Sequence, residues 1–206
     1  MHLLARISIV VISLLFCSSS ALAEQVSYKK TWKVRARADA VVQVLTDYNR
    51  YCDSGCRYRY PSVTAAVILP YKRTVNSFFV WTLVEDVKDS EWFSHVTIRK
   101  GGNRSVVQFS MVSEKQGEKL EKISRRPHDP VFDACVTRYE ITEVFRNDRF
   151  LYSQIAFSAK VTVSGLISIF SGAVKSGLED TGKAMVHNIS RGAAKPSTKP
   201  SKGKRF

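Results

Sequence analysis

Several signatures of common enzyme classes are missing from this sequence. It contains no H-E-x-x-H zinc motif, no G-x-S-x-G nucleophile elbow and no glycine-rich phosphate loop. Among its 4 histidines, His95, His128 and His187 have no partner at a catalytic or metal-binding spacing. We interpret them as ordinary strand or surface histidines. The sequence therefore predicts no catalytic residue, no metal site and no cofactor.

Long apolar runs are also missing beyond the N-terminal region. The run at residues 7–17 is too short for an ordinary membrane-spanning helix, which needs about 20 residues. It follows Arg6 and precedes the small residues Ala21 and Ala23, and this order is typical of a secretory signal peptide. We expect residues 1–23 to be a signal peptide and the protein to be exported, to the periplasm or outside the cell.

Acidic residues are few: 18 Asp and Glu stand against 32 Lys and Arg, for a net charge of +14. Residues 191–206 are rich in Pro, Ser, Gly and Lys and contain no acid, so we expect a disordered basic tail. A basic balance favours anionic partners, and no nucleic-acid motif is present. The tail is predicted either to contact an anionic membrane transiently or only to aid solubility.

Cysteine is scarce, with 4 in the chain. Cys52 and Cys56 are close enough to pair across a tight loop or one helical turn. Export makes a disulfide between them the favoured prediction, with free thiols as the alternative. The CDSGC stretch lacks the second ligand pair that a metal site needs. Cys135, in an apolar strand pattern, is expected to be a small buried residue.

Hydrophobic periodicity predicts an α+β fold. We expect a strand at residues 27–36, then a helix at 39–51 with Asp39 as its N-cap. Residues 52–61 are expected to be a loop or a broken second helix, and residues 113–130 a polar connection with at most one short strand. Further strands are expected at residues 62–69, 73–86, 91–99, 104–112, 134–145 and 149–161, with turns at Gly101-Gly102 and Asn147-Asp148. Strands in a run with the helices set apart from them are typical of α+β proteins.

The last periodic segment, residues 163–189, is predicted to be a long amphipathic helix. Its charged residues recur at i, i+4 spacing, which suits a solvated face. The opposite face carries the small residues Ala173, Gly177 and Thr181. An interior glycine costs a helix roughly 0.5–1 kcal/mol relative to alanine. Either the helix backbone lies close to the sheet here, or space is left for a ligand beneath Gly177.

Three motifs connect this element order to a known family. They are V-x-x-V-L-T-D-Y at residues 41–48, Y-x-x-x-x-C at 51–56, and FSGAVKSGLEDTGKAMVHNIS at 170–190. Together with the order of strands and helices, they resemble the START-like (SRPBCC, polyketide cyclase-like) superfamily, and within it the coenzyme Q-binding and ribosome-association-toxin-like branch. The signal peptide, the CDSGC loop and the basic tail depart from that branch. The resemblance covers nearly all of residues 24–190, which we expect to form one ligand-binding domain.

The resemblance implies a helix-grip fold, in which a curved antiparallel sheet of about six to seven strands wraps around the C-terminal helix. An apolar cavity would separate the two. The residues expected to bind the ligand there are Phe79, Trp81, Tyr139, Ile141, Ile155, Phe157, Phe170, Ala173, Gly177 and Thr181. Thr137 is a further source of a polar group. Periodicity alone would interpret these side chains as interlocked core; it is the resemblance that favours a cavity.

The predicted function is therefore binding of a hydrophobic small molecule, a lipid or an isoprenoid quinone. One alternative is a cyclase- or aromatase-type enzyme, which would need an acid or base such as His95 or Glu85 in the cavity. Another is a basic envelope interaction module with a filled core and no ligand.

Overall fold

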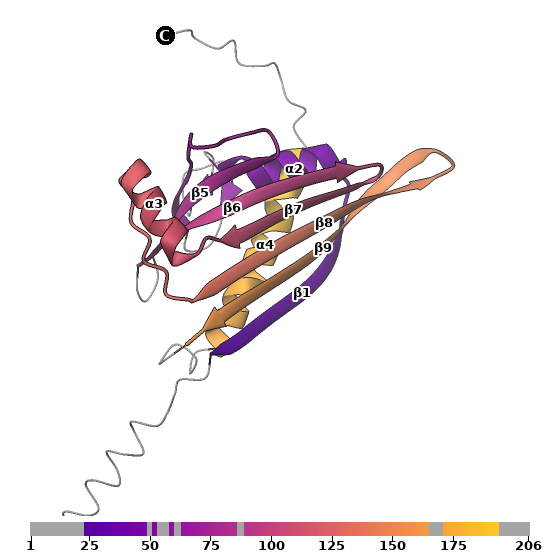
Figure 1. Cartoon of the computed structure of the whole chain (residues 1–206). Coiled ribbons are helices and arrows are strands. Elements are labelled where there is room, and N and C mark those ends of the chain that lie inside the picture. The colour runs from indigo at the N-terminus through magenta and orange to yellow at the C-terminus, as the bar shows by residue number, and fades with distance from the viewer. Residues whose placement is uncertain are drawn as a thin grey trace, which may run out of the picture.

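The computed structural model of the chain describes residues 23–48, 51–52, 58–59, 63–85, 89–164 and 171–193 (Figure 1). The expected signal peptide, up to residue 22, and the part of the basic tail from residue 194 lie outside these ranges. So does Cys56, and the side chain of Cys52 is not described, so the disulfide stays a prediction.

A seven-stranded antiparallel sheet forms the body of the protein, in the order β1-β9-β8-β7-β6-β5-β4. Its strands are β1 (Glu24–Val34), β4 (Val63–Ile68), β5 (Ser77–Val84), β6 (Ser90–Gly101), β7 (Arg104–Met111), β8 (Ala134–Arg146) and β9 (Arg149–Val163). A separate parallel pair joins β2 (Tyr51–Cys52) to β3 (Tyr58–Arg59). The predicted α+β architecture with its curved antiparallel sheet is confirmed.

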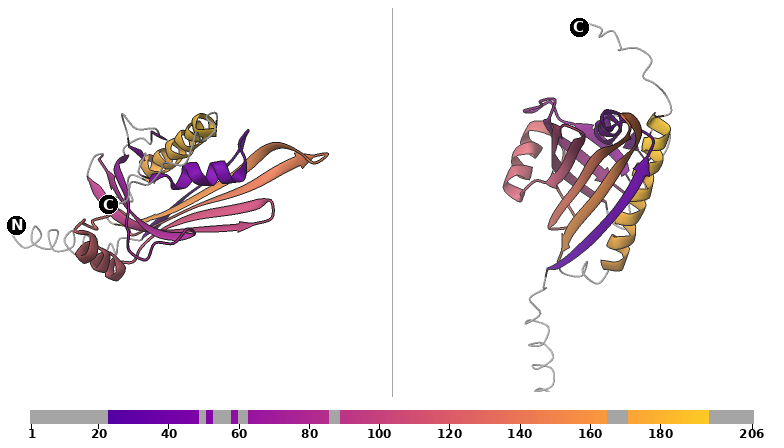
Figure 2. Two further views of the ribbon diagram at one scale, coloured as in Figure 1. Left: turned by 90° about the horizontal axis from the view of Figure 1, so that it is seen from above. Right: turned by 90° about the vertical axis from the view of Figure 1, so that its right-hand side faces the viewer.

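The helices cover both faces of this sheet. Helices α2 (Ala38–Thr46) and α4 (Ser171–Ala193) lie on one face, called here the inner face, and α3 (Glu114–Ser124) lies on the other, the outer face (Figure 2). None of the helices in the described ranges is long and apolar enough to cross a bilayer.

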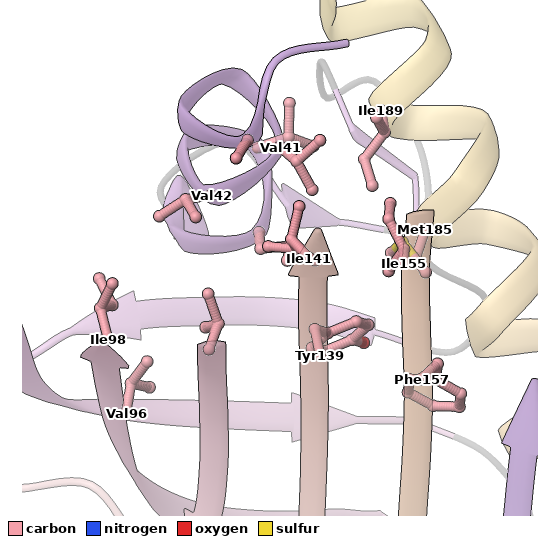
Figure 3. Close-up of a cluster of buried hydrophobic side chains, with 14 of the residues drawn as sticks. Val41, Val42, Val96, Ile98, Tyr139, Ile141, Ile155, Phe157, Met185 and Ile189 are labelled. Carbon is pink, nitrogen blue, oxygen red and sulfur yellow. The ribbon is translucent and has the colours of Figure 1, made fainter. Parts of the chain in front are cut away.

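The main core lies between the inner face of the sheet and the two helices above it. Met185 and Ile189 are one helical turn apart in α4, and both are fully buried. They pack in one cluster with Ile155 of β9, Ile141 of β8 and Val41 of α2 (Figure 3). Side chains at alternate positions of each strand share one face of a sheet, so β8 and β9 deliver their buried residues to this layer together.

Helix α3 corrects the prediction of a polar connection at residues 113–130. Only Gly117 and Leu120 of this helix are buried, so its apolar stripe is too thin for periodicity to reveal. Leu120 completes a second, smaller core on the outer face, where it packs with Phe79, Trp81 and Phe93.

The two predicted hairpin turns are confirmed. Gly102 has φ 54°, while Asn147 and Asp148 have φ 49° and 59°. Two successive positive φ angles define the tight turn that suits a two-residue hairpin, and Asn and Asp tolerate this conformation better than most residues.

The ends of the two inner-face helices differ from the prediction. Helix α2 begins at Ala38 and ends at Thr46 rather than residue 51, and its N-cap is Arg37, not Asp39. Val163 is the last residue of β9, and α4 is described from Ser171. Helix α4 also continues to Ala193, three residues into the segment expected to be disordered.

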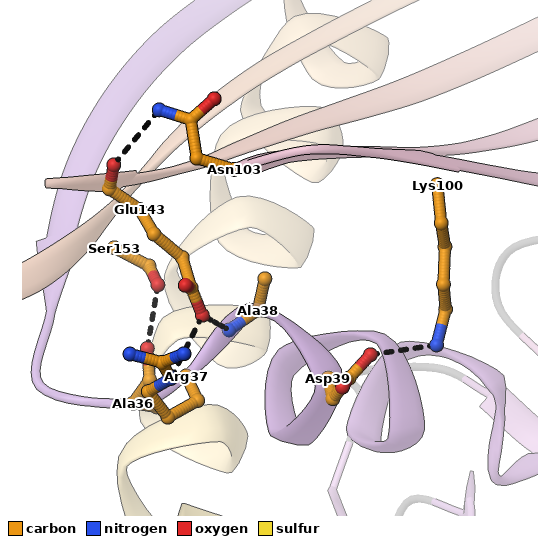
Figure 4. Close-up of polar contacts among 8 residues, drawn as sticks. All are labelled: Ala36, Arg37, Ala38, Asp39, Lys100, Asn103, Glu143 and Ser153. Carbon is orange, nitrogen blue, oxygen red and sulfur yellow. Dashed lines mark hydrogen bonds and ion pairs between the residues drawn. The ribbon is translucent and has the colours of Figure 1, made fainter.

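A glutamate from the sheet caps the start of α2 in place of Asp39. Glu143 Oε1 accepts a hydrogen bond from the Ala38 N–H at 2.7 Å and forms an ion pair with Arg37 Nε at 3.1 Å (Figure 4). Asp39 instead pairs with Lys100 at 2.6 Å on the surface. The true cap is 105 positions away in the chain, so local sequence patterns do not reveal it.

Candidate ligand-binding cavity

A cavity of about 170 Å³ lies between the inner face of the sheet and helices α2 and α4. It is partly open to solvent. Strands β4 to β8, helix α4 and the end of α2 supply its lining. The lining residues are Leu45, Tyr48, Val63, Ala66, Val80, Thr82, Trp92, Ser94, Phe109, Cys135, Thr137, Tyr139 and Thr181.

Strand alternation explains why these residues meet. Cys135, Thr137 and Tyr139 occupy alternate positions of β8, and Trp92 and Ser94 do the same in β6. Strands β8 and β6 therefore present three and two cavity residues, and the residues between them point to the outer face.

Aromatic rings form one wall of the cavity. The ring of Phe109 meets Tyr48 at a centroid distance of 5.9 Å and Tyr139 at 5.7 Å, both edge to face. Tyr139 in turn contacts Phe157, with centroids 5.0 Å apart. Edge-to-face contacts such as the two of Phe109 add about 0.5–1.5 kcal/mol beyond area burial, so they help to hold this wall together.

The polar groups of the cavity are hydroxyls and one thiol. The indole N–H of Trp92 donates to Ser94 Oγ at 3.2 Å, and the Thr181 hydroxyl donates to the Gly177 carbonyl at 2.8 Å. Among the described residues, the Thr137 hydroxyl has only a 4.0 Å contact to Cys135 Sγ. Among the described lining residues there is no carboxylate, imidazole, ammonium or guanidinium group. The lining can donate hydrogen bonds to a ligand, but it offers no ordinary acid or base.

The thiol of Cys135 stays protonated near neutral pH. Burial raises the pKa of this group to about 11, against an ordinary value of 9.0. Because the thiolate is the nucleophilic form of cysteine, Cys135 is a weakly reactive part of the lining.

Comparisons with known proteins identify the fold. No family model and no curated protein matches the chain by sequence. Among solved structures, the aromatase/cyclase Zhui from Streptomyces sp. R1128 has 16% identity and a TM-score of 0.54, over 83% of this chain and 94% of that one. Human STARD10 has 14% identity and a TM-score of 0.54, over 79% of this chain and 62% of that one. The chain has a START-like fold.

A third match shows how far the likeness extends. The di-domain aromatase/cyclase BexL, from the BE-7585A biosynthetic pathway, has 10% identity and a TM-score of 0.53 over 84% of this chain. The chain spans about half of that protein's length, 51%. Identities this low establish the START-like fold and no more.

Within this START-like fold, Tyr139 and Thr181 line the cavity as predicted. Ile141, Ile155 and Phe157 lie on the inner face as well, fully or almost fully buried in the adjoining core. They support the cavity wall and are not part of its lining.

The placement of Phe79 and Trp81 was wrong. Both point to the outer face and pack beneath α3, while their neighbours Phe78 and Val80 point inward. Strand β5 has the sequence SFFVWTLV and carries apolar residues on both faces. Its pattern therefore does not show which set of alternate residues faces the helices α2 and α4. A shift of one residue exchanges every side chain between them.

The placement of Ala173 and Gly177 was also wrong. Both are exposed, and a Cβ added at Gly177 would have no atom within 4 Å. Thr181 is the small residue of α4 that reaches the cavity. Phe170 lies outside the described residues.

The two residues that would have supported an enzyme do not face the cavity. His95 is on the outer face, where its Nε2 lies 2.8 Å from Ser77 Oγ and its ring stacks on Phe79 at 4.8 Å. Glu85 is exposed just beyond the end of β5. In the described part of the chain, no three His, Cys, Asp or Glu side chains are grouped to hold a metal ion.

Most of the lining was not predicted. Trp92 and Ser94 occupy the same set of alternate positions in β6 as Val96 and Ile98. Knowing that these positions face inward would have identified them as cavity residues. Tyr48 closes one of the motifs shared with the START-like superfamily. Nothing in the local sequence distinguishes Ala66 or Thr82 as cavity residues.

Proposed function

We propose that this chain is an exported START-like protein that binds a hydrophobic small molecule, a lipid or an isoprenoid quinone, between its sheet and its helices. The observation that carries the proposal is the cavity itself, which is mainly apolar with a few hydroxyl groups. Ligand pockets in proteins have this composition, because apolar walls supply affinity and a few polar groups fix orientation.

The size of the cavity limits how much of the ligand is enclosed. Its volume of about 170 Å³ is below the roughly 300–1,000 Å³ of pockets that bury a whole drug-sized molecule. A ring head group or a short section of an isoprenoid or acyl chain fits this space better than an entire lipid. The rest of the ligand would extend through the open side.

The hydroxyls favour a ligand with acceptor oxygens. Thr137 lies between Cys135 and Tyr139 on β8, and its hydroxyl has only a long contact to the thiol. A quinone ring carries two carbonyl acceptors and no donor, which complements such hydroxyl donors. This match is the reason for naming quinones beside lipids.

Export is supported by the signal-peptide pattern of residues 1–23. Edman sequencing of the protein recovered from its native compartment would test it directly. An N-terminus at Glu24 is expected, and an intact Met1 in a cytoplasmic fraction would refute export.

A cyclase-type enzyme is the alternative that the likeness to aromatase/cyclases raises. Such chemistry needs an acid or base near the substrate, and the described lining has no carboxylate or imidazole, only the phenols of Tyr48 and Tyr139 and the thiol of Cys135. Binding without turnover is therefore the better proposal.

Native mass spectrometry of protein purified without detergent tests ligand binding. We expect a bound apolar species, or its uptake from added quinone or lipid. The variant Thr137→Phe should fill the cavity and abolish uptake. Val136→Phe is the matched control, because the neighbouring side chain is 40% exposed on the outer face of the same strand. Absence of uptake by the wild type, or equal uptake by both variants when both are folded, would refute the proposal.

A further inference from the structure

A second cleft lies on the outer face of the sheet, on the opposite side from the ligand cavity. It has a volume of about 340 Å³ and forms where the loop before β5 meets α3. The buried side chains of Phe79 and Leu120 form its base. Tyr71 and three lysines, Lys72, Lys115 and Lys119, surround them.

None of the three ammonium groups of this cleft has a counterion among the residues that the structure describes. Lys72, Lys115 and Lys119 are exposed, and none of them is within ion-pair distance of a carboxylate in the described ranges. Other lysines do find partners: Lys100 pairs with Asp39 at 2.6 Å, and Lys183 pairs with Glu179 at 3.1 Å. The cleft therefore gathers three uncompensated positive charges.

Helix α3 contributes two of its lysines to the cleft. Lys115 and Lys119 are one turn apart and share a stripe that faces the cleft. Glu121 faces a different side of the helix, where its carboxylate accepts a hydrogen bond from the His128 backbone N–H. The carboxylate of Glu121 is thus directed away from the lysines of the cleft.

Tyr71 brings two of these lysines together. The ammonium of Lys72 lies 5.6 Å from the centre of the Tyr71 ring, and that of Lys119 lies 5.9 Å from it. Cations are held at this distance by the negative face of an aromatic ring. A hydrogen bond with Lys119, more than the nearby positive charges, lowers the pKa of the Tyr71 phenol.

The backbone at Lys72 is unusual as well. Its φ is 47°, in the left-handed region where glycine, asparagine and aspartate are the common residues. A lysine at this turn position is conformationally costly, and it places a third ammonium at the cleft.

We propose that this cleft binds a phosphate group carried by an organic ligand. Lysines bind phosphate as point charges, and a phosphate monoester dianion compensates more of the charge of three lysines than one carboxylate does. The Ser113 hydroxyl and the Gln116 amide lie in the same cleft and add neutral donors. The apolar base formed by Phe79 and Leu120 suits the organic part of a phosphoester.

NMR titration of the purified protein with inorganic phosphate and with glycerol 3-phosphate tests this site, at ionic strength held constant with sodium chloride. We expect saturable shifts of the amide signals of Tyr71, Gln116 and Lys119. The triple variant Lys72→Gln, Lys115→Gln, Lys119→Gln should lose them, with at least a tenfold weaker apparent affinity. The matched control neutralises three exposed lysines of β1 and β9, Lys29, Lys30 and Lys160, and should keep them.

A second arm identifies the source of the phosphate group. Vesicles containing phosphatidic acid, whose head group is a phosphate monoester, are compared with vesicles of phosphatidylcholine in a co-sedimentation assay. If the cleft variant loses binding to phosphatidic acid while the control variant keeps it, the phosphate belongs to a lipid head group. If only the soluble phosphates bind through the cleft, the ligand is a soluble phosphoester.

Two results would overturn the proposal. One is the absence of saturable shifts together with unchanged vesicle binding by the cleft variant. The other is an equal loss in the cleft and control variants, because it would reflect overall charge rather than a site. If the triple variant fails to fold, the single change Lys119→Gln replaces it and must weaken binding. Ligand uptake by the inner cavity is measured separately, so either proposal can fail alone.

Discussion

Gly182 of α4 lies directly against the indole ring of Trp32 in β1. A Cβ placed on Gly182 would be 2.6 Å from Trp32 Cη2, closer than real carbon contacts allow. The same indole meets Phe157 at a centroid distance of 5.9 Å. A hydrogen in place of a side chain at residue 182 therefore lets α4 settle onto the sheet and holds Trp32 against the core.

Replacing Gly182 with alanine should destabilise the protein. We expect a loss of about 1–3 kcal/mol, the usual cost of overpacking, because the half-buried indole has little room to move. Gly177→Ala is the matched control in the same helix. It is exposed and unobstructed, so it should gain about 0.5–1 kcal/mol from helix propensity. Urea unfolding measures both, and similar effects at the two sites would contradict this account.

This contact clarifies what the sequence could reveal about α4. Its pattern of small residues offered two explanations, close packing or space for a ligand, and both occur at different residues. Gly182 makes the close contact, Thr181 reaches the cavity, and Gly177 does neither. The helical period gives the relative angles of side chains, but the absolute rotation of the helix depends on the sheet it packs against.

The same limit applies to the sheet and to α3. The succession of strands along the chain and both hairpin turns follow from local patterns, since turn residues and alternation act over a few positions. The inner face of β5 does not, because Phe78 and Phe79 are equally apolar. Helix α3 escaped prediction because Leu120 is the only large buried side chain on it.

The ion pair and hydrogen bond of Glu143 should contribute measurably to stability. Its side chain is only 10% exposed and satisfies both the Ala38 N–H and Arg37. Glu143→Ala leaves that N–H without its acceptor, and we expect a loss of about 1–2 kcal/mol, as for removal of a helix cap. Glu143→Gln keeps an acceptor oxygen and should lose less.

Asp39→Ala is the comparison for this prediction. The Asp39 carboxylate is 81% exposed in its pair with Lys100, and exposed pairs contribute little. Chemical unfolding of the three variants should rank them Glu143→Ala, Glu143→Gln, Asp39→Ala, from largest loss to smallest. A larger loss for Asp39→Ala would restore that residue as the cap of α2.

His128 should make the protein less stable in mild acid. Its Nδ1 accepts the backbone N–H of Phe93 at 3.2 Å, and Gly117 lies against its ring. Burial lowers the pKa of His128 from its ordinary 6.5, although the carboxylates of Glu114, Glu121 and Asp129 oppose the shift. Below pH 6.5 the unfolded chain therefore binds more protons than the folded one, and stability falls as the pH falls toward the lowered pKa.

Urea unfolding between pH 8 and pH 5 measures this dependence. The variant His128→Gln should be less stable at pH 8 but should show a shallower decline toward pH 5. His187→Gln, which removes an exposed histidine of α4, should keep the wild-type slope. An unchanged slope in His128→Gln would show that other groups cause the acid sensitivity.

Cys135 offers a direct test of whether the inner cavity is occupied. Because burial raises the pKa of its thiol to about 11, little thiolate exists at pH 8, and alkylation by iodoacetamide should be slow. The rate should rise with pH toward that value, whereas in urea it should match an ordinary cysteine with a pKa near 9.0. Between pH 9 and pH 11 the unfolded chain loses this proton first, so the thiol lowers stability as the pH rises.

Mass mapping of the modified peptide separates Cys135 from the other cysteines. A ligand in the cavity should slow its alkylation further, and unchanged alkylation at saturating ligand would mean that the ligand binds elsewhere.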